Sequence, residues 1–400
     1  MPSISEAADS SAKWAAIAIG FSVPISVALD NVLMLAVFCF WLVGGDLKEK
    51  IHVISESRVS LAALALIGFL AIGMFYGNAS FHDALNAFGK YIDLLFVPVF
   101  FTIFEDRKAR RLALAGFVSA MMLTLLLSYL LKSGIVHQNS ILRGTRDNPY
   151  VFKLYLTQNF FMAFAAMILA TWSFFESDQK KRLFFALLSA LASFNVLFMV
   201  QGRIGYIVLA LLLPYLFIRK FGAKGLAIGM LAVTLLGASA YFGSREFRQR
   251  IDIAASEFSH WHRGHATRTD NSIGQRLEYD VNTLAVIRQH PFFGAGTGGF
   301  EKAYASSVAG TGMVAPHHPH NEFLLIASQL GIPGLLLLLS LFYIQWREAS
   351  MLPAREQYLA HGLVLAMASG CLFNSFLLDH AEGLFFAFMT GAIFSEKRQN

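Results

Sequence analysis

Histidine is the most concentrated reactive residue type in this sequence. Seven of the twelve histidines lie between residues 260 and 320, as H-x-H-x-x-H at 260–265, His290, and H-H-x-H at 317–320. Because imidazole titrates near neutral pH and ligates zinc, this enrichment suggests proton transfer or metal binding. Neither cluster contains a cysteine, and an acid, Glu322, stands beside the second only. We therefore expect no metal, and we interpret the histidines at 260–265 as solvated loop residues.

The second cluster has a more distinctive position. His320 lies where a long polar stretch enters a long apolar run, and Pro316 and Pro319 stiffen its approach. This position at the membrane boundary makes His320 a candidate for proton transfer. His317 and His318 are nearby alternatives, and the sequence does not decide among the three. Supporting residues would be the neighbours Asn321 and Glu322, together with Asp379, an acid of a later short turn.

Arginine is the second signal. Arg203 interrupts an apolar stretch between Gln201-Gly202 and Ile204-Gly205-Tyr206. Arg276 and Arg288 lie on an expected amphipathic helix, and Lys90 is a cation near the end of another apolar run. Guanidinium groups bind phosphate through two parallel charge-assisted hydrogen bonds. We therefore predict a site for an anionic, lipid-linked head group, although a snorkelling Arg203 or a solvated helix face remains an alternative for each arginine.

The composition defines the class of protein. The chain has 400 residues, of which 56% are hydrophobic and 14% charged, and its mean hydropathy is +0.54. This balance excludes a soluble protein. The net charge is +6. In a membrane protein, lysine and arginine first determine orientation in the membrane, so we expect no nucleic-acid partner. Cys39 and Cys371 lie in apolar runs, so no disulfide is proposed.

The hydropathy pattern predicts an all-α integral membrane protein with about twelve transmembrane helices. The acidic N-terminus, with Glu6 and Asp9, favours a retained first span over a signal peptide. The weakest segments are 32–45, which is short, and 84–104, which contains Lys90 and Asp93. The candidate spans are residues 14–29, 32–45, 59–77, 84–104, 112–131, 153–175, 183–201, 204–219, 223–242, 322–346, 358–378 and 383–395.

The distribution of basic residues tests this count. Fifteen lysines and arginines fall in the connections after spans 2, 4, 6, 8 and 10, whereas the short connections after spans 1, 3, 7 and 11 contain only Arg203. Because cytoplasmic loops collect basic residues, both termini are predicted to be cytoplasmic. The long connections at 132–152 and 243–321 then lie on the outer side, which is the periplasm in a bacterium.

The connection at 243–321 is the one large extramembrane region. It predicts helices at 245–261 and at 275–290, where Pro291 ends the second. The glycines at 294, 296, 298 and 299 predict a flexible loop, and no strand precedes them to make a dinucleotide site. We divide the chain into spans 1–9 (residues 1–242), the catalytic periplasmic loop (243–321), and spans 10–12 with a cytoplasmic tail (322–400).

One motif resembles a known family. His320-Asn321, nine residues, and then Gly331-Ile332-Pro333-Gly334 resemble the H-N-x9-G-x-x-G motif of O-antigen ligases and related bactoprenol-dependent transferases. Gly202-Arg203-Ile204-Gly205, Arg276 and the stretch 290–298 also fit this family. The match runs through residues 150–395. Gly331, Pro333 and Gly334 are expected to bend span 10, either to admit lipids or as a packing kink.

The resemblance implies a function. Proteins of this family transfer a polysaccharide from undecaprenyl pyrophosphate to an acceptor at the periplasmic face of the inner membrane, without nucleotide-sugar, metal or cofactor. It implies that Arg203 and Arg276 hold the pyrophosphate and that His320 activates an acceptor hydroxyl of lipid A–core. Arg288 is added from its charge and position. A single displacement would invert the sugar, because no pair of carboxylates suited to a retaining reaction is evident.

Other functions stay open. An O-antigen polymerase or a protein O-oligosaccharyltransferase would use the same donor, and nothing in the sequence names the acceptor. A lipid-linked sugar transporter or flippase is the alternative of another class. It predicts paired charges within spans and repeated halves, whereas no inverted repeat is visible here.

Overall fold

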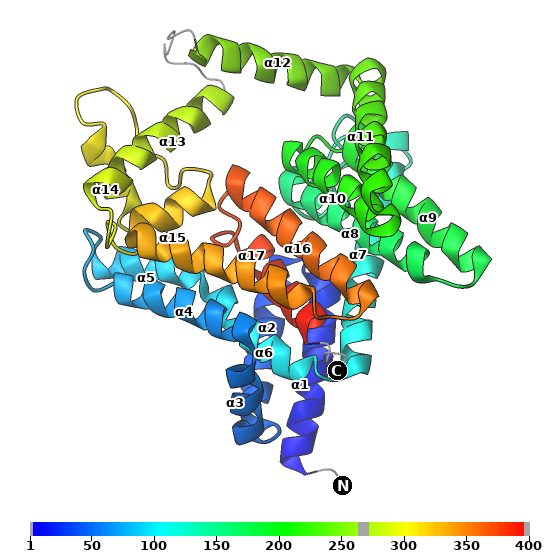
Figure 1. Ribbon diagram of the computed structural model, residues 1–400, viewed down its shortest axis with the longest axis horizontal. Coiled ribbons are helices and arrows are strands. Elements are labelled where there is room, and N and C mark those ends of the chain that lie inside the picture. The colour runs from blue at the N-terminus through cyan, green and yellow to red at the C-terminus, as the bar shows by residue number, and fades with distance from the viewer. Residues whose placement is uncertain (1–2, 263–271, 396–400) are drawn as a thin grey trace.

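The protein is a bundle of helices. The computed structural model describes residues 3–262 and 272–395, and every regular element in these two ranges is helical, which confirms the all-α class. Figure 1 shows α12 and α13 lying above the bundle, with α14 beside them. The helices are α1 (Ile4–Ser22), α2 (Val27–Val43), α3 (Leu47–Glu56), α4 (Arg58–Gly73), α5 (Phe81–Lys90), the 3-10 turn η1 (Ile92–Leu95), α6 (Phe96–Ile103), α7 (Arg107–Ser133), α8 (Tyr155–Phe175), α9 (Gln179–Phe194), the π turn η2 (Asn195–Met199), α10 (Arg203–Phe221), α11 (Ala223–Gly243), α12 (Arg245–His262), α13 (Ser272–Gln289), α14 (Phe300–Ser307), α15 (Glu322–Ala349), α16 (Ala354–Phe373) and α17 (His380–Phe394).

The helices have the character of a multi-pass membrane protein. In the described residues, six helices are long and apolar enough to cross a membrane, and the number rises to eight if each of two bent pairs is one span. The shorter helices α4 and α17 are also apolar. A helix overlaps each of the twelve predicted segments. Twelve crossings and the cytoplasmic location of both termini stay predictions.

The boundary between the first two predicted spans is wrong. The predicted span 14–29 runs across a break, because α1 ends at Ser22 and α2 begins at Val27. Pro24 lies in the break, and the Ser26 side chain caps α2 by accepting a hydrogen bond from the Leu29 amide. The predicted gap between these spans, residues 30–31, lies inside α2, and Asp30 is buried in the first turn of this helix.

The predicted span 84–104 is not one straight helix, since the chain bends by 55° where α5 gives way to η1 and α6. Whether this bent pair crosses the membrane as one span stays a prediction. Helix α5 is amphipathic: Phe81 and Leu85 are 58% and 48% exposed, while Asp83 and Lys90 occupy its polar side. A helix of this kind lies along a membrane surface more readily than across it. The apolar remainder of the segment, α6, is largely buried.

The glycine-rich segment 294–299 is ordered, which corrects the prediction of a flexible loop. The amides of Ala295 and Gly296 donate to the carbonyl oxygens of Ser328 and Gln329, each at 2.8 Å. The Thr297 amide and hydroxyl donate to the carbonyl oxygens of Gly73 and Leu70 on α4. The segment therefore packs between α4 and α15. Its backbone amides donate hydrogen bonds to carbonyl oxygens of these two helices, which are distant in the sequence.

The expected bend in span 10 is present. Gly331 has φ 70° inside α15, and the Ile332 amide donates to the carbonyl oxygen of Pro291 at 2.7 Å. The glycine segment thus supplies partners at the break in α15. It also fixes the positions of α13 and α14, which lie on either side of it along the chain.

Replacing Gly331 with alanine is expected to lower the melting temperature of the purified protein. An added Cβ would lie 2.5 Å from the carbonyl group of Phe292, and the left-handed backbone alone costs a non-glycine residue about 1–2 kcal/mol. Gly68→Ala is the matched control, because a Cβ at this α4 position meets nothing within 4 Å. Equal melting temperatures for the two variants would contradict the prediction.

The connections expected on the outer side meet at one end of the bundle, which we call the His320 end. Hydrogen bonds join them pairwise across long stretches of sequence. These pairs are Lys153 with Asp30, Gln201 with Asn148, Thr297 with Gly73, Lys302 with Asn78, and His320 with Asn374.

Candidate active site

His320 is held at the start of α15 by an unusual backbone conformation. Its φ is 59°, and it is the only non-glycine residue with positive φ within residues 3–262 and 272–395. Asn321 follows as the N-cap of α15, where its side-chain oxygen accepts a hydrogen bond from the Leu324 amide at 3.2 Å. The H-N pair is therefore a reactive residue followed by a cap. Such a strained position is typical of functional sites.

A chain of hydrogen bonds orients the His320 ring. Nδ1 of His320 lies 3.1 Å from Oδ1 of Asn374, and Nδ2 of Asn374 donates to Oδ2 of Asp379 at 2.9 Å. Because the side-chain nitrogen of Asn374 donates to the carboxylate of Asp379, the side-chain oxygen of Asn374 is the atom that accepts a hydrogen bond from the imidazole of His320. His320 is thus assigned the tautomer with the proton on Nδ1, and Nε2 carries the lone pair that a general base needs.

His318 is held in the opposite tautomer. Its Nδ1 accepts a hydrogen bond from the His320 amide at 3.3 Å and lies 3.2 Å from the hydroxyl of Ser375, which donates to it. Burial lowers the pKa of His318 to about 4, and the charge of His320 adds to this effect. A neutral His318 therefore presents N–H at Nε2. It can donate a hydrogen bond, but it is poorly placed to accept a proton.

His317 points elsewhere. Its side chain is 88% exposed, and its Nδ1 lies 3.1 Å from Oε2 of Glu301 on α14. Of the three rival histidines, the geometry therefore favours His320 as the base.

The pKa of His320 lies below its ordinary value of about 6.5. Burial lowers this pKa, the hydrogen bond to Asn374 opposes the shift, and the charge of Arg276 adds to it. Because this pKa is lowered, His320 is mostly neutral at pH 7. A base must be neutral to accept a proton, so activity should rise as the pH increases through this pKa and then level off.

Asn374→Ala is expected to change the pH profile in two ways. Loss of the opposing hydrogen bond lowers the pKa of His320 further, so the acid limb of kcat moves to lower pH. The plateau falls by about 10–100-fold, because the ring loses the partner that orients it. Measuring kcat against pH separates the two effects. A profile that matches the parent in both respects would show that Asn374 does not act on His320.

Two arginines converge near this histidine. Arg276 on α13 is half-buried, and its pKa is lowered by burial and next by the positive charge of Arg203, the first residue of α10. Arg276 in turn lowers the pKa values of both His318 and His320. The two predicted arginines are thus near enough for their charges to interact, and Arg276 is near enough to influence both histidines.

The N-termini of α8 and α10 adjoin Arg203. Neither N-cap, Leu154 for α8 or Gly202 for α10, supplies a side-chain capping bond. Asn159 of α8 donates to the Gly202 carbonyl oxygen at 2.8 Å, which holds the two helix starts together. Helix N-termini attract anions, and their effect adds to that of the arginine charges. This arrangement is suited to a phosphate-bearing ligand.

The other predicted cations lie differently. Arg288 follows Arg276 by twelve residues on α13, which is about 18 Å along a helix, and it is exposed. The structure does not bring it to the arginine pair. Lys90 lies close enough for its charge to lower the pKa values of His318 and Asp379. It therefore belongs to the histidine side of the site.

Glu322 has a structural contact pattern. It is fully buried, and its carboxylate accepts hydrogen bonds from the Tyr91 hydroxyl at 2.8 Å and the Leu377 amide at 2.9 Å. It thereby anchors the turn at residues 374–379, which carries Asn374 and Asp379. Its effect on His320 is exerted through that turn.

Several residues of the site were missed at the sequence level. Tyr279 of α13 stacks near His320, with ring centroids 6.4 Å apart. Asn374 was placed inside the predicted span 358–378, although the polar pair Asn374-Ser375 marks the end of the apolar run of α16. The helical spacing of Arg276 and Tyr279 puts both on one side of α13.

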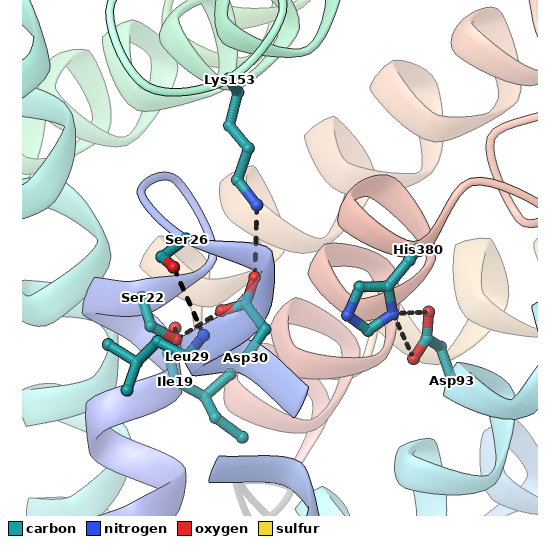
Figure 2. A network of polar contacts seen from close by, with 8 residues as sticks. All are labelled: Ile19, Ser22, Ser26, Leu29, Asp30, Asp93, Lys153 and His380. Atoms are coloured by element: carbon teal, nitrogen blue, oxygen red, sulfur yellow. Dashed lines mark hydrogen bonds and ion pairs between the residues drawn. The ribbon is translucent and has the colours of Figure 1, made fainter. Parts of the chain in front are cut away.

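A buried polar network, also missed, supports the same end of the bundle. Figure 2 shows Asp30 between Lys153 and Ser22, and His380 turned toward Asp93. The Lys153–Asp30 distance is 3.3 Å and the His380–Asp93 distance is 3.0 Å. Buried ion pairs of this kind fix relative positions more than they add stability.

No group of three or more histidine, cysteine, aspartate or glutamate side chains within the described ranges is arranged to hold a metal ion. His265 of the first cluster lies outside the described residues. The side chains of His260 and His262 are not described either.

One comparison with known families gives a match. A family model described as O-Antigen ligase matches residues 188–339, so this stretch is similar to that family. The match includes the H-N motif and confirms the resemblance seen in the sequence, whereas no curated protein matches the chain. The matched region begins within α9 and ends within α15, so it contains Arg203, Arg276 and His320 but not Asn374 or Asp379.

Proposed function

We propose that this protein is a glycosyltransferase that moves an O-antigen polysaccharide from undecaprenyl pyrophosphate to a sugar hydroxyl of lipid A–core. The observation that carries the proposal is the Asp379–Asn374–His320 chain, which leaves Nε2 of His320 as a base beside Arg276. The match of residues 188–339 to the O-antigen ligase model supports the reaction class. The protein would lie in the bacterial inner membrane, with its His320 end facing the periplasm.

The reaction is a single displacement. The acceptor hydroxyl oxygen attacks the anomeric carbon of the donor sugar and forms the new glycosidic bond, while the bond from that carbon to the pyrophosphate oxygen breaks. His320 Nε2 takes the hydroxyl proton, and undecaprenyl pyrophosphate leaves with the bonding electrons. Attack opposite the leaving group inverts the anomeric configuration. Proton transfer to a placed base typically contributes about 10²–10⁴-fold.

Arginine supplies the electrostatic part of this mechanism. Negative charge grows on the pyrophosphate as the bond breaks, and fixed cations aimed at that position lower the barrier. Arg203 and Arg276 would hold the two phosphates, assisted by the starts of α8 and α10. Because their charge is permanent near neutral pH, the leaving group needs no divalent ion.

Chelation tests the metal-independent mechanism. Transfer by the purified protein is expected to continue at its full rate in EDTA, since arginines neutralise the leaving group. Loss of activity in EDTA that added Mg²⁺ or Mn²⁺ restores would contradict it.

The central experiment combines purified protein in detergent with lipid-linked polysaccharide and lipid A–core, followed by separation of the products on a gel. Transfer to lipid A–core supports the ligase. Elongation of the donor alone would indicate a polymerase, and glycosylation of an added protein a protein O-oligosaccharyltransferase. Movement of the lipid-linked donor across the membrane of proteoliposomes, without covalent transfer, would favour the transporter.

A further inference from the structure

A pocket with both charged and apolar lining residues lies beside the histidines, between α5 and α14. Its volume is about 580 Å³, within the ~300–1,000 Å³ range of small-molecule sites. Four α5 residues line it with the spacing of one helix face, namely Asp83, Asn86, Ala87 and Lys90. Glu301, Lys302 and Ala305 of α14 line the other side. Figure 1 shows α5 and α14 on the same side of the molecule, near the start of α15.

The floor of the pocket is rigid. Gly298 and Gln329 both line it, and the Gly298 amide donates to Oε1 of Gln329 at 2.7 Å. Phe300 and Leu325, two buried residues, complete the floor. The floor of the pocket is therefore built on the docked glycine segment and α15, while Val314, Ala315 and His317 of the loop before α15 complete its lining.

The pocket adjoins the base without including the arginine pair. His317 lines the pocket, and His320 follows it three positions later, a span of at most about 11 Å. Leu378, another lining residue, is next to Asp379. Arg203 and Arg276 come from α10 and α13, which contribute no lining residue. The segment from His317 to His320 thus connects the pocket to the proposed pyrophosphate site.

The chemistry of the lining differs from that of the arginine pair. The pocket has two carboxylates, two lysines and two amides, so its formal charge is zero. Such a set offers both donors and acceptors to hydroxyl groups, and its lysines can bind phosphate or carboxylate substituents on a sugar. A pyrophosphate calls for a positive site. A decorated saccharide fits this mixed lining better.

The outer face of α5 places the pocket at the membrane surface. Phe81 and Leu85 are exposed on the side of α5 away from Asp83 and Lys90. An amphipathic helix with exposed aromatic and aliphatic residues lies in the interfacial plane. The first sugars of a lipid-anchored glycan occupy this same depth.

We propose that the pocket between α5 and α14 binds the sugar residues of the lipid-anchored acceptor and directs the attacking hydroxyl to His320. The inference rests on the proposed glycosyl transfer and adds to it a site for the second substrate. It also assigns Lys90 to the acceptor rather than to the pyrophosphate. Donor and acceptor then reach the base from different helices.

The test introduces a large side chain at Ala305, an exposed residue that lines the pocket. Ala305→Trp is expected to raise the KM for lipid A–core by about tenfold or more, with the donor KM unchanged, because the indole occupies acceptor space. Ser306→Trp is the matched control, since Ser306 is the exposed neighbour on α14 that does not line the pocket. Lys302→Ala should raise the acceptor KM in the same direction, by about 10–100-fold if it binds a charged substituent.

A binding measurement separates this inference from the proposed function. The probe is the core oligosaccharide released from lipid A by mild acid, titrated against parent and Ala305→Trp proteins with ligand-observed NMR. Binding by the parent that Ala305→Trp weakens and Ser306→Trp does not would support the pocket. If the parent transfers sugar but both tryptophan variants behave alike, the pocket inference fails and the function stands. A rise in donor KM alone would assign the pocket to the donor glycan and overturn the inference. Absence of transfer by the parent would instead refute the proposed function.

Discussion

Replacing His320 with alanine is expected to lower kcat by about 10²–10⁴-fold while the affinity for the lipid-linked donor stays unchanged. The imidazole accepts the acceptor proton only as the new bond forms, so its loss weakens the transition state and not the bound donor. Single-turnover transfer and a separate donor-binding measurement check the two parts. The fold should survive, since the ring is half-buried and alanine creates no large cavity.

Two neighbouring histidines provide controls. His317→Ala should keep kcat close to that of the parent, because this exposed side chain contacts Glu301 and faces away from the base. His318→Ala removes a neutral donor, and its effect should be smaller than that of His320→Ala. Near-normal transfer by His320→Ala, or an equal loss in His317→Ala, would require another base.

Arg276→Ala is expected to lower kcat/KM by about 10²–10³-fold, the usual effect of losing one donor that stabilises developing charge. Arg276→Lys should recover only part of this loss, because an ammonium keeps the charge but not the planar pair of hydrogen-bond donors. The alanine variant has a second signature. The charge of Arg276 lowers the pKa of His320, so its removal raises that pKa and moves the acid limb of the pH profile upward.

Arg288→Ala is the matched control on the same helix. Arg288 is exposed and stands about 18 Å along α13 from Arg276, so its removal should leave kcat/KM nearly unchanged. An upward shift of the acid limb without loss of kcat/KM in Arg276→Ala would show that Arg276 acts on His320 and not on the pyrophosphate. Equal losses in Arg276→Ala and Arg288→Ala would point to general surface charge.

Local patterns predicted much of the site. Helix α13 was expected at 275–290 and is found at Ser272–Gln289, because apolar spacing and Pro291 define it within one stretch of chain. The H-N pair and Gly331 were identified through the family motif, which occupies one short stretch of sequence. Asp379 was predicted to support His320, but Asn374, which connects the two, was missed. The contact between His320 and Asn374 spans more than fifty residues, and no periodicity predicts it.

The errors have the same origin. The predicted gap between spans at residues 30–31 is wrong because Asp30 is buried in α2, and its partner Lys153 lies 123 positions away. The glycine segment looked flexible because its hydrogen-bond partners belong to α4 and α15. In both cases the deciding interaction is distant in sequence. In such cases the local residue types predict a loop or a flexible segment where the structure has a helix or an ordered segment.

The position of Asn374 has a practical consequence for dissecting this protein. The region that matches the O-antigen ligase model ends at residue 339, so a fragment limited to it would keep His320 but lose the Asn374 amide that sets its tautomer. It would also lose Lys90 and Tyr91, which precede the matched region in the sequence. We therefore expect a fragment limited to the matched region to be inactive. Truncations and chimaeras should carry residues 374–379 together with the H-N motif, as one exchangeable unit.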